Sequence, residues 1–159
     1  MTFTHEDWQS IRSTVARAGF CAVASINADG SAHLTPIGSV WLEKEPGKAM
    51  LFQRFTRQLP DNALRDERIC LLATRNDAWF WIKALILGRF AAPPGVRIYA
   101  RLGPPRPARP EEIARFHGRM KLFRWTRGFR LLWADLRVAR DLHIEAVRPV
   151  VIGPMSQPA

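Results

Sequence analysis

Short apolar runs separated by turn-forming residues fill most of the chain between residues 20 and 102. Runs of this length and composition are typical of β-strands. The stretch Asn27-Ala-Asp29-Gly30, between the first two runs, has the composition of a hairpin turn. Because each run follows the last after only a few turn residues, the pattern predicts a small antiparallel β-barrel. Strands are expected at 20–26, 31–42, 49–55, 69–74, 79–87 and 96–102.

Helical patterns lie on both sides of this β-rich part and inside it. Thr4 with Asp7 resembles a capping box, and apolar residues recur at helical spacing up to Gly19, which closes the first helix. Proline followed by acidic residues predicts further helix starts near Pro60 and Pro110. The chain is therefore expected to form one domain over residues 1–159, mainly β with α. Helices are expected at 4–18, 60–68, 110–123 and 129–136, and two last strands at 142–147 and 150–152.

The composition is typical of a globular domain in water, with 47% hydrophobic and 24% charged residues. The first eight residues include acidic ones where a signal peptide would be basic and then apolar. The most apolar stretch, 79–90, is too short to span a bilayer and contains Lys83 and Arg89. We therefore expect a cytoplasmic protein with no membrane partner. Cys21 and Cys70 lie apart in apolar runs, which predicts free thiols.

The chain carries a formal net charge of +10, and the surplus is concentrated between residues 106 and 140. An excess of this kind can bind nucleic acid, a membrane surface or an anionic small molecule. No nucleic-acid-binding motif accompanies the charge, so nucleic acid ranks below a ligand that carries a phosphate. A solvated, arginine-rich surface is the alternative interpretation.

The first candidate ligand site lies in the second expected strand, at residues 33–39. Pro36 removes a hydrogen-bond donor from the strand ladder, and Gly38 removes side-chain bulk. A strand of this kind exposes backbone groups that can bind a flat ring. A bulge at a barrel corner explains the same residues equally well. The candidate ligand-binding residues here are Thr35, Pro36, Ile37 and Gly38.

The second candidate site follows the third expected strand. Two arginines, a hydroxyl and amide groups stand just ahead of an expected helix, which suits them to hold a phosphate. A solvated strand end is the alternative. Asn62, in the first turn of that helix, either caps the helix or reaches the ligand. The candidate residues are Arg54, Phe55, Thr56, Arg57 and Gln58, with Asn62 beside them.

No arrangement of catalytic side chains is evident, so the catalytic residues stay unknown. The four histidines are scattered without the spacing of metal ligands, and no metal site is expected. A nucleophile motif, a glycine-rich phosphate loop and a pair of carboxylates are also missing from the sequence. If the protein is an enzyme, its reactive chemistry belongs to a cofactor. Trp79 and Trp81 are predicted to share one strand face, either in the core or a dimer interface, or against a ligand of a neighbouring subunit.

Three stretches resemble the pyridoxamine 5'-phosphate oxidase-like family of flavoproteins. Residues 20–38 are similar to the family's first hairpin, residues 50–69 to its flavin-phosphate segment, and residues 96–103 to a later barrel strand. The resemblance covers about residues 8–155 and implies an antiparallel, Greek-key split β-barrel that binds FMN. It further implies a homodimer with the flavin at the subunit interface. Residues 35–38 would face the isoalloxazine ring, while Arg54, Thr56, Arg57 and Gln58 would hold the phosphate and ribityl chain, with Asn62 nearby.

One position departs from the family pattern. Many members carry a lysine shortly before the helix asparagine, where this chain has Leu59. Either Arg57 supplies the missing charge or the cofactor differs, since some members bind a deazaflavin and others haem. The resemblance implies an FMN-dependent oxidoreductase of unknown substrate. The alternatives are a deazaflavin-dependent reductase, a flavin-binding module without turnover, and a nucleic-acid-binding protein that uses the surplus at 106–140.

Overall fold

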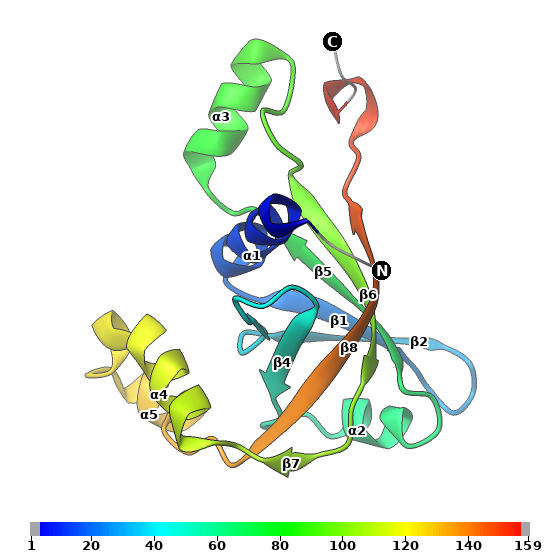
Figure 1. Cartoon of the computed structure of the whole chain (residues 1–159), viewed down its shortest axis with the longest axis vertical. Coiled ribbons are helices and arrows are strands. Elements are labelled where there is room, and N and C mark those ends of the chain that lie inside the picture. The colour runs from blue at the N-terminus through cyan, green and yellow to red at the C-terminus, as the bar shows by residue number, and fades with distance from the viewer. Residues whose placement is uncertain (1–3, 157–159) are drawn as a thin grey trace.

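The computed structural model of the chain describes residues 4–156 (Figure 1). Its strands are β1 (Cys21–Ile26), β2 (Ala32–Ile37), β3 (Trp41–Leu42), β4 (Lys48–Phe52), β5 (Arg68–Thr74), β6 (Gly95–Leu102), β7 (Arg106–Pro107) and β8 (Val138–Pro149). Its α-helices are α1 (His5–Ala18), α2 (Gln58–Ala63), α3 (Ala78–Leu87), α4 (Pro110–Arg119) and α5 (Arg127–Trp133), and two 3-10 helices are η1 (Lys121–Phe123) and η2 (Gly153–Ser156).

The strands form one antiparallel sheet in the order β2-β1-β5-β6-β8-β4-β3, with β7 paired to β8. The sheet curls into a half-barrel, and a register shift between Tyr99 and Ala100 in β6 marks a bulge of the kind that increases strand twist. The predicted class, an antiparallel β-barrel with flanking helices, is confirmed.

Helix α1 packs on the sheet against β3, β5 and β6. The hydroxyl of Thr4 accepts a hydrogen bond from the Asp7 N–H at 3.1 Å, as the capping box predicted. Gly19 closes the helix with a φ of 77°. Trp8 is fully buried and its indole N–H donates to the Glu43 carbonyl at 2.8 Å, which ties α1 to the end of β3. The main core lies between this helix and the inner sheet face.

The first hairpin forms as predicted, since β1 pairs with β2 around the turn 27–30. Strand β2 lies at one edge of the sheet. The missing N–H of Pro36 is therefore tolerated, because an edge strand needs partners on one side only. The edge position thus explains how a strand can contain a residue that removes a hydrogen-bond donor from the ladder.

The fifth expected strand, 79–87, is wrong, because these residues form helix α3. Asp77 caps its start by accepting from the Phe80 N–H at 3.2 Å, and Gly88 ends it in the left-handed conformation. Strands β5 and β6 pair directly from Arg68–Arg101 to Thr74–Gly95, so the sheet has no place for another strand here. Helix α3 projects from one end of the barrel (Figure 1). Among residues 4–156, no helix has the length and apolar character needed to cross a membrane.

Other boundaries shift by a few residues. Helix α2 begins two residues earlier and ends five residues earlier than expected, and α5 begins two residues earlier and ends three residues earlier. Strand β8 begins at Val138, four residues before the expected start at Leu142, and the expected strand 150–152 does not form. The long β8 pairs with β4, β6 and β7, so it joins the barrel to the α4–α5 region.

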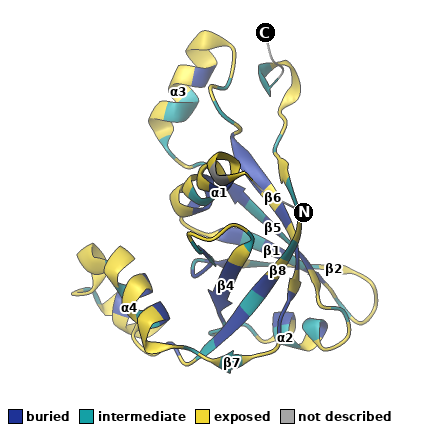
Figure 2. Cartoon of the chain, in the orientation of Figure 1, coloured by how far each residue is buried: buried dark blue, intermediate teal, exposed yellow. Residues whose placement is uncertain are grey.

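A second, smaller core attaches α4 and α5 to the barrel. Phe116 of α4 meets Phe52 of β4 edge to face, with ring centroids 5.6 Å apart. Leu136, two residues before β8, and Ala139, near the start of that strand, are buried beside them. The outward surfaces of α4 and α5 are largely exposed (Figure 2).

An arginine-centred cluster closes the junction of β7, α4 and β8. The guanidinium of Arg106 binds both carboxylate oxygens of Glu112 at 2.7 and 2.9 Å, and both of Asp141 at 2.7 and 2.9 Å. Glu112 also accepts from the Arg109 N–H at 2.9 Å. Bidentate contacts of this kind fix orientation as well as charge.

Candidate functional site

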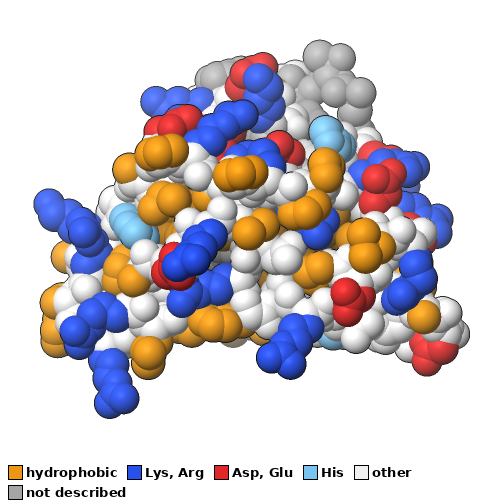
Figure 3. Space-filling model, turned by 90° about the horizontal axis from the view of Figure 1, so that it is seen from below, with side chains coloured by type: hydrophobic (Ala, Val, Ile, Leu, Met, Phe, Trp, Pro, Cys, Tyr) orange, Lys and Arg blue, Asp and Glu red, His pale blue; other side chains and the backbone are white. Residues whose placement is uncertain are grey.

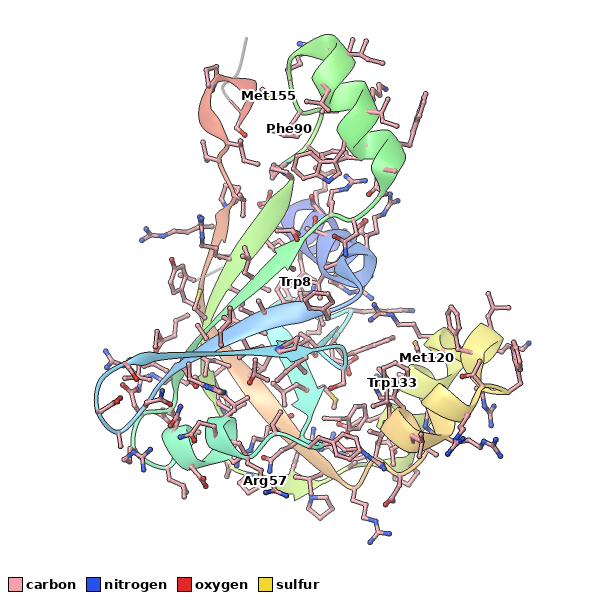
Figure 4. The ribbon with its side chains drawn as sticks, turned by 180° about the vertical axis from the view of Figure 1, so that it is seen from behind. Trp8, Arg57, Phe90, Met120, Trp133 and Met155 are labelled. Carbon is pink, nitrogen blue, oxygen red and sulfur yellow. The ribbon has the colours of Figure 1, made fainter. Side chains whose placement is uncertain are left out.

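One cavity of about 510 Å³ opens between the edge strand β2, the chain that follows β4, and helix α5. Figure 4 labels two of its lining residues, Arg57 beside α2 and Trp133 on α5. The lining residues are His33, Thr35, Pro36, Ile37, Gly38, Ser39, Phe52, Arg54, Phe55, Thr56, Arg57, Gln58, Leu132, Trp133 and Leu136.

The two candidate sites of the sequence analysis meet in this one cavity. Of the ten candidate residues predicted from the sequence, nine line the cavity, and the exception is Asn62. Asn62 is fully buried and its amide donates to Ser25 Oγ at 2.9 Å and to Asn27 Oδ1 at 3.0 Å. Its oxygen accepts from the side chains of Gln58 and Arg65. Asn62 therefore joins α2 to the first hairpin, and it does not itself line the cavity, although it holds the side chain of Gln58, which does.

The chain turns sharply where it leaves β4. Gln53, the residue after β4, still continues the pairing with β8, because its N–H donates to the Val138 carbonyl at 2.9 Å. Phe55 then adopts a φ of 60°, and no other non-glycine residue within 4–156 has a positive φ. A left-handed residue with a Cβ costs about 1–2 kcal/mol, so the surrounding structure must hold it in place. Backbone strain of this kind clusters at ligand sites in proteins.

Two polar groups at this turn have no partner among residues 4–156, one of them buried and the other exposed. The Oγ1 atom of Thr56 is buried and makes no hydrogen bond, the one such side-chain atom within residues 4–156. An orphaned buried hydroxyl costs about 1–3 kcal/mol, which a ligand would recover. The neighbouring Arg57 is exposed, and no ion pair or hydrogen bond of its guanidinium is present in the described part of the chain. Helix α2 has only six residues, so the cation and the hydroxyl, rather than a helix terminus, are what this end offers an anion.

Arg54 has a different role from Arg57. Its guanidinium donates to the carbonyls of Leu131, at 3.1 Å, and of Asp135, and lies 4.7 Å from the centre of the Phe55 ring. Arg54 therefore holds the C-terminal part of α5 against the chain that follows β4. Its guanidinium is used to position the cavity wall that α5 forms, whereas the guanidinium of Arg57 is available to a ligand.

The sequence analysis missed the wall that α5 supplies. Leu132, Trp133 and Leu136 line the cavity, and Trp133 packs against Phe116 with ring centroids 6.1 Å apart. The ring of His117 is hydrogen-bonded to the Trp133 carbonyl at 2.8 Å. These residues lie far from β2 in sequence, and the helical pattern at 129–136 gave no sign of which face would meet β2.

The cavity carries positive charge and no carboxylate. Its ionisable lining residues are His33, Arg54 and Arg57. The His33 ring is hydrogen-bonded to Thr35 Oγ1 at 2.9 Å. The cavity is thus suited to an anionic ligand with an apolar part. In the part of the chain that the structure describes, no three His, Cys, Asp or Glu residues lie close enough to hold a metal ion.

The two tryptophans predicted to share a strand face lie on α3 instead, outside this cavity. The indole N–H of Trp81 donates to the Arg75 carbonyl at 2.8 Å, and Trp79 is 73% exposed. Because successive helix residues point in different directions, these two residues do not form one aromatic surface.

Comparisons with solved structures identify the fold. An FMN-binding protein from Syntrophomonas wolfei superposes with a TM-score of 0.63 at 12% identity, covering 91% of this chain and 86% of that one. A candidate pyridoxamine 5'-phosphate oxidase from Lactobacillus delbrueckii gives 0.52 at 16% identity, with 92% and 93% covered. An F420 reductase gives 0.55 at 14% identity, with 86% and 94% covered. No protein-family model matches the sequence, and no curated protein sequence does.

These similarities, with the curled antiparallel sheet, define the class. The chain has the split-barrel fold of the pyridoxamine 5'-phosphate oxidase-like proteins. Structures of this fold include proteins whose names record FMN or F420 as their ligands or cofactors.

Proposed function

We propose that the cavity binds FMN and that the protein is a flavin-dependent oxidoreductase. The observation that carries this proposal is that one cavity combines a buried, unsatisfied Thr56 hydroxyl and the neighbouring cation of Arg57 with apolar lining residues such as Ile37 and Trp133. A flavin mononucleotide combines the same two chemistries, a phosphate and an aromatic ring system.

Each part of the cavity has a task in this proposal. Thr56, Arg57 and Gln58 would hold the phosphate and ribityl chain. The ring would lie toward Ile37 and Trp133, which are apolar lining residues. The free edge of β2 offers backbone N–H and C=O groups that its single neighbour β1 leaves unpaired, and such groups are suited to the polar edge of the ring. When bound, FMN supplies the redox chemistry by accepting a hydride, and the protein orients the ring and excludes water.

We propose further that the working form is a homodimer with the cavity at the subunit interface. Phe55, at the cavity rim, is 70% exposed, and β2 ends the sheet without a partner on its outer side. A second copy that covers this rim would shield both the ring and the exposed aromatic side chain from water.

The experiment compares FMN with riboflavin, which has the same ring and no phosphate. We would titrate each into the wild type and into Arg57→Ala, following flavin fluorescence. Loss of one charge-assisted contact should weaken FMN binding by about 1.5–3 kcal/mol, or roughly 10- to 150-fold in Kd. Riboflavin binding should change little. Lys44→Ala, which removes an exposed cation outside the cavity, is the matched control and should leave both ligands unaffected.

An equal loss of FMN and riboflavin affinity in Arg57→Ala would remove the arginine from the phosphate site. Binding of a phosphate-bearing deazaflavin in preference to FMN would keep the site and change the cofactor to the F420 type. Failure of the wild type to bind any of these ligands would overturn the proposal.

A further inference from the structure

The basic surplus of the sequence gathers on one surface segment. Residues 113–134 contain six Lys and Arg residues and no Asp or Glu. The segment covers most of α4, then η1 and all of α5. Seen from below, the side of the molecule where α4 and α5 lie shows projecting Lys and Arg side chains next to hydrophobic ones (Figure 3).

Four of these six cations have no partner among residues 4–156. Arg115 pairs with Glu43 at 2.8 Å, and Arg119 donates to the Ala16 carbonyl at 2.9 Å. The remaining four make no ion pair and no side-chain hydrogen bond with any residue between 4 and 156. They recur at every third position, and they are Lys121, Arg124, Arg127 and Arg130.

Large apolar side chains stand exposed between these cations. Leu122 is 81% exposed and Trp125 is 83% exposed, and Phe123 and Leu131 are more than half exposed. The Trp125 indole N–H bonds only locally, to the Leu122 carbonyl at 2.9 Å. A contiguous exposed apolar surface marks an interaction site in a protein that is stable in water. We call residues 121–131 the basic apolar segment.

The four unpaired cations restrict which kind of partner can bind the basic apolar segment. If this segment formed a two-fold interface it would pack against its own copy, so four unpaired cations would lie near four more. A single-stranded nucleic acid would satisfy the charge and stack on Trp125, but the exposed leucines add nothing to base stacking. An anionic bilayer satisfies both features, because lipid phosphates attract Lys and Arg while Trp and Leu side chains enter the boundary between head groups and acyl chains.

We propose that the basic apolar segment docks the protein on the surface of an anionic lipid bilayer. The expectation of no membrane partner rested on the lack of a spanning segment, and surface docking needs none. Helix α5 then has two roles, since its first part meets the lipid and its last part, with Leu132 and Trp133, lines the cavity. The proposal is independent of which ligand the cavity binds.

Vesicle sedimentation of the whole protein tests this. The probe is a vesicle of equal parts phosphatidylcholine and phosphatidylglycerol, compared with phosphatidylcholine alone. Binding is expected only to the anionic vesicles at about 0.1 M NaCl, and should be largely lost at about 1 M, where the Debye length falls to about 3 Å. Replacing two cations, in Lys121→Gln with Arg124→Gln, should lower the partition coefficient about 30-fold, since each basic residue near such a surface contributes roughly five-fold.

The contribution of the exposed apolar side chains to vesicle binding is tested with a separate variant and control. Leu122→Ser with Trp125→Ser should reduce vesicle binding while leaving the thermal unfolding curve unchanged, because both side chains are exposed. Leu64→Ser, at a residue that is 83% exposed beyond α2, should leave binding intact, and so should Lys44→Gln. Equal binding to neutral and anionic vesicles, or no binding, would overturn the proposal. So would a shift from dimer to monomer caused by the double serine variant, or binding to single-stranded DNA without binding to vesicles.

Discussion

The Arg106 cluster gives the sharpest test of how the α4–α5 region is held on the barrel. Arg106 joins β7 to Glu112 of α4 and to Asp141 of β8 through two bidentate contacts. Removing its side chain in Arg106→Ala leaves Glu112, whose side chain is only 7% exposed, without its charged partner. The variant should therefore loosen the helices that carry the cavity wall.

The size of the effect follows from the partial burial of the cluster. A fully buried pair that loses one partner costs about 3–5 kcal/mol, and a surface pair costs about 0–1 kcal/mol. Glu112 is buried, Arg106 is 21% exposed and Asp141 is half-exposed. We therefore expect Arg106→Ala to lower the free energy of unfolding by about 2 kcal/mol near pH 7. Arg115→Ala breaks the more exposed pair with Glu43, in which one guanidinium nitrogen donates to both carboxylate oxygens, and should cost about 1 kcal/mol or less.

The pH dependence of the stability difference between wild type and Arg106→Ala distinguishes the loss of these ion pairs from a loss of packing alone. Burial alone would raise the pKa of Glu112, but hydrogen bonds from Arg106 and from the Arg109 N–H hold that pKa below its ordinary value. Hydrogen bonds from Arg106 also lower the pKa of Asp141. Since both carboxyls have lowered pKa values in the fold, their stabilisation is present above the ordinary values and is lost as pH falls through the lowered ones.

Urea unfolding, followed by circular dichroism near pH 7 and at steps down to about pH 3, measures this difference. The gap between wild type and Arg106→Ala should be largest at neutral pH and shrink below about pH 4. A gap that stays constant to the lowest pH, or that equals the gap for Arg115→Ala, would refute the assigned role of the cluster.

Two substitutions and one chemical modification experiment test other parts of the structure. Asn62→Leu removes the hydrogen bonds that join α2 to the first hairpin and should cost about 2–4 kcal/mol in urea unfolding; a neutral result would contradict the buried junction. Gly95→Ala places a Cβ 2.6 Å from the Ala73 carbonyl oxygen, so overpacking should cost about 1–3 kcal/mol and lower the Tm; an unchanged Tm would count against that contact. Burial raises the pKa of the Cys21 thiol to about 12, and burial also raises the pKa of the less buried Cys70. Mass spectrometry after iodoacetamide treatment of the folded protein should find Cys70 alkylated first, and the reverse order would be inconsistent with this packing.

Features with a local cause could be predicted from the sequence. The cap at Thr4 and the glycine at position 19 bound α1, and the turn at 27–30 brings β1 and β2 together, because these effects act within a few residues. The two halves of the candidate site were also visible as local departures from ordinary strand composition. That they belong to one site was implied only by the family resemblance.

Other features were missed, either because the local pattern was ambiguous or because the feature depends on tertiary contacts. The run 79–87 is apolar except for Lys83, and such a run suits a buried strand and a helix alike. The signals that decide for α3 are the capping Asp77 and the left-handed Gly88, which outweigh the β-propensity of the aromatic residues. The role of Asn62 depends on Ser25 and Asn27, and the cavity wall depends on Trp133, so each required the folded chain.

The central claim, that the cavity holds a phosphate-bearing flavin, is tested most directly by the purified protein itself. Its absorption spectrum would be recorded after exposure to FMN and removal of the excess, and the small molecule released on denaturation would be identified by mass spectrometry. The account predicts a flavin spectrum and about one FMN released per chain. A colourless protein that retains neither FMN nor a deazaflavin would contradict it.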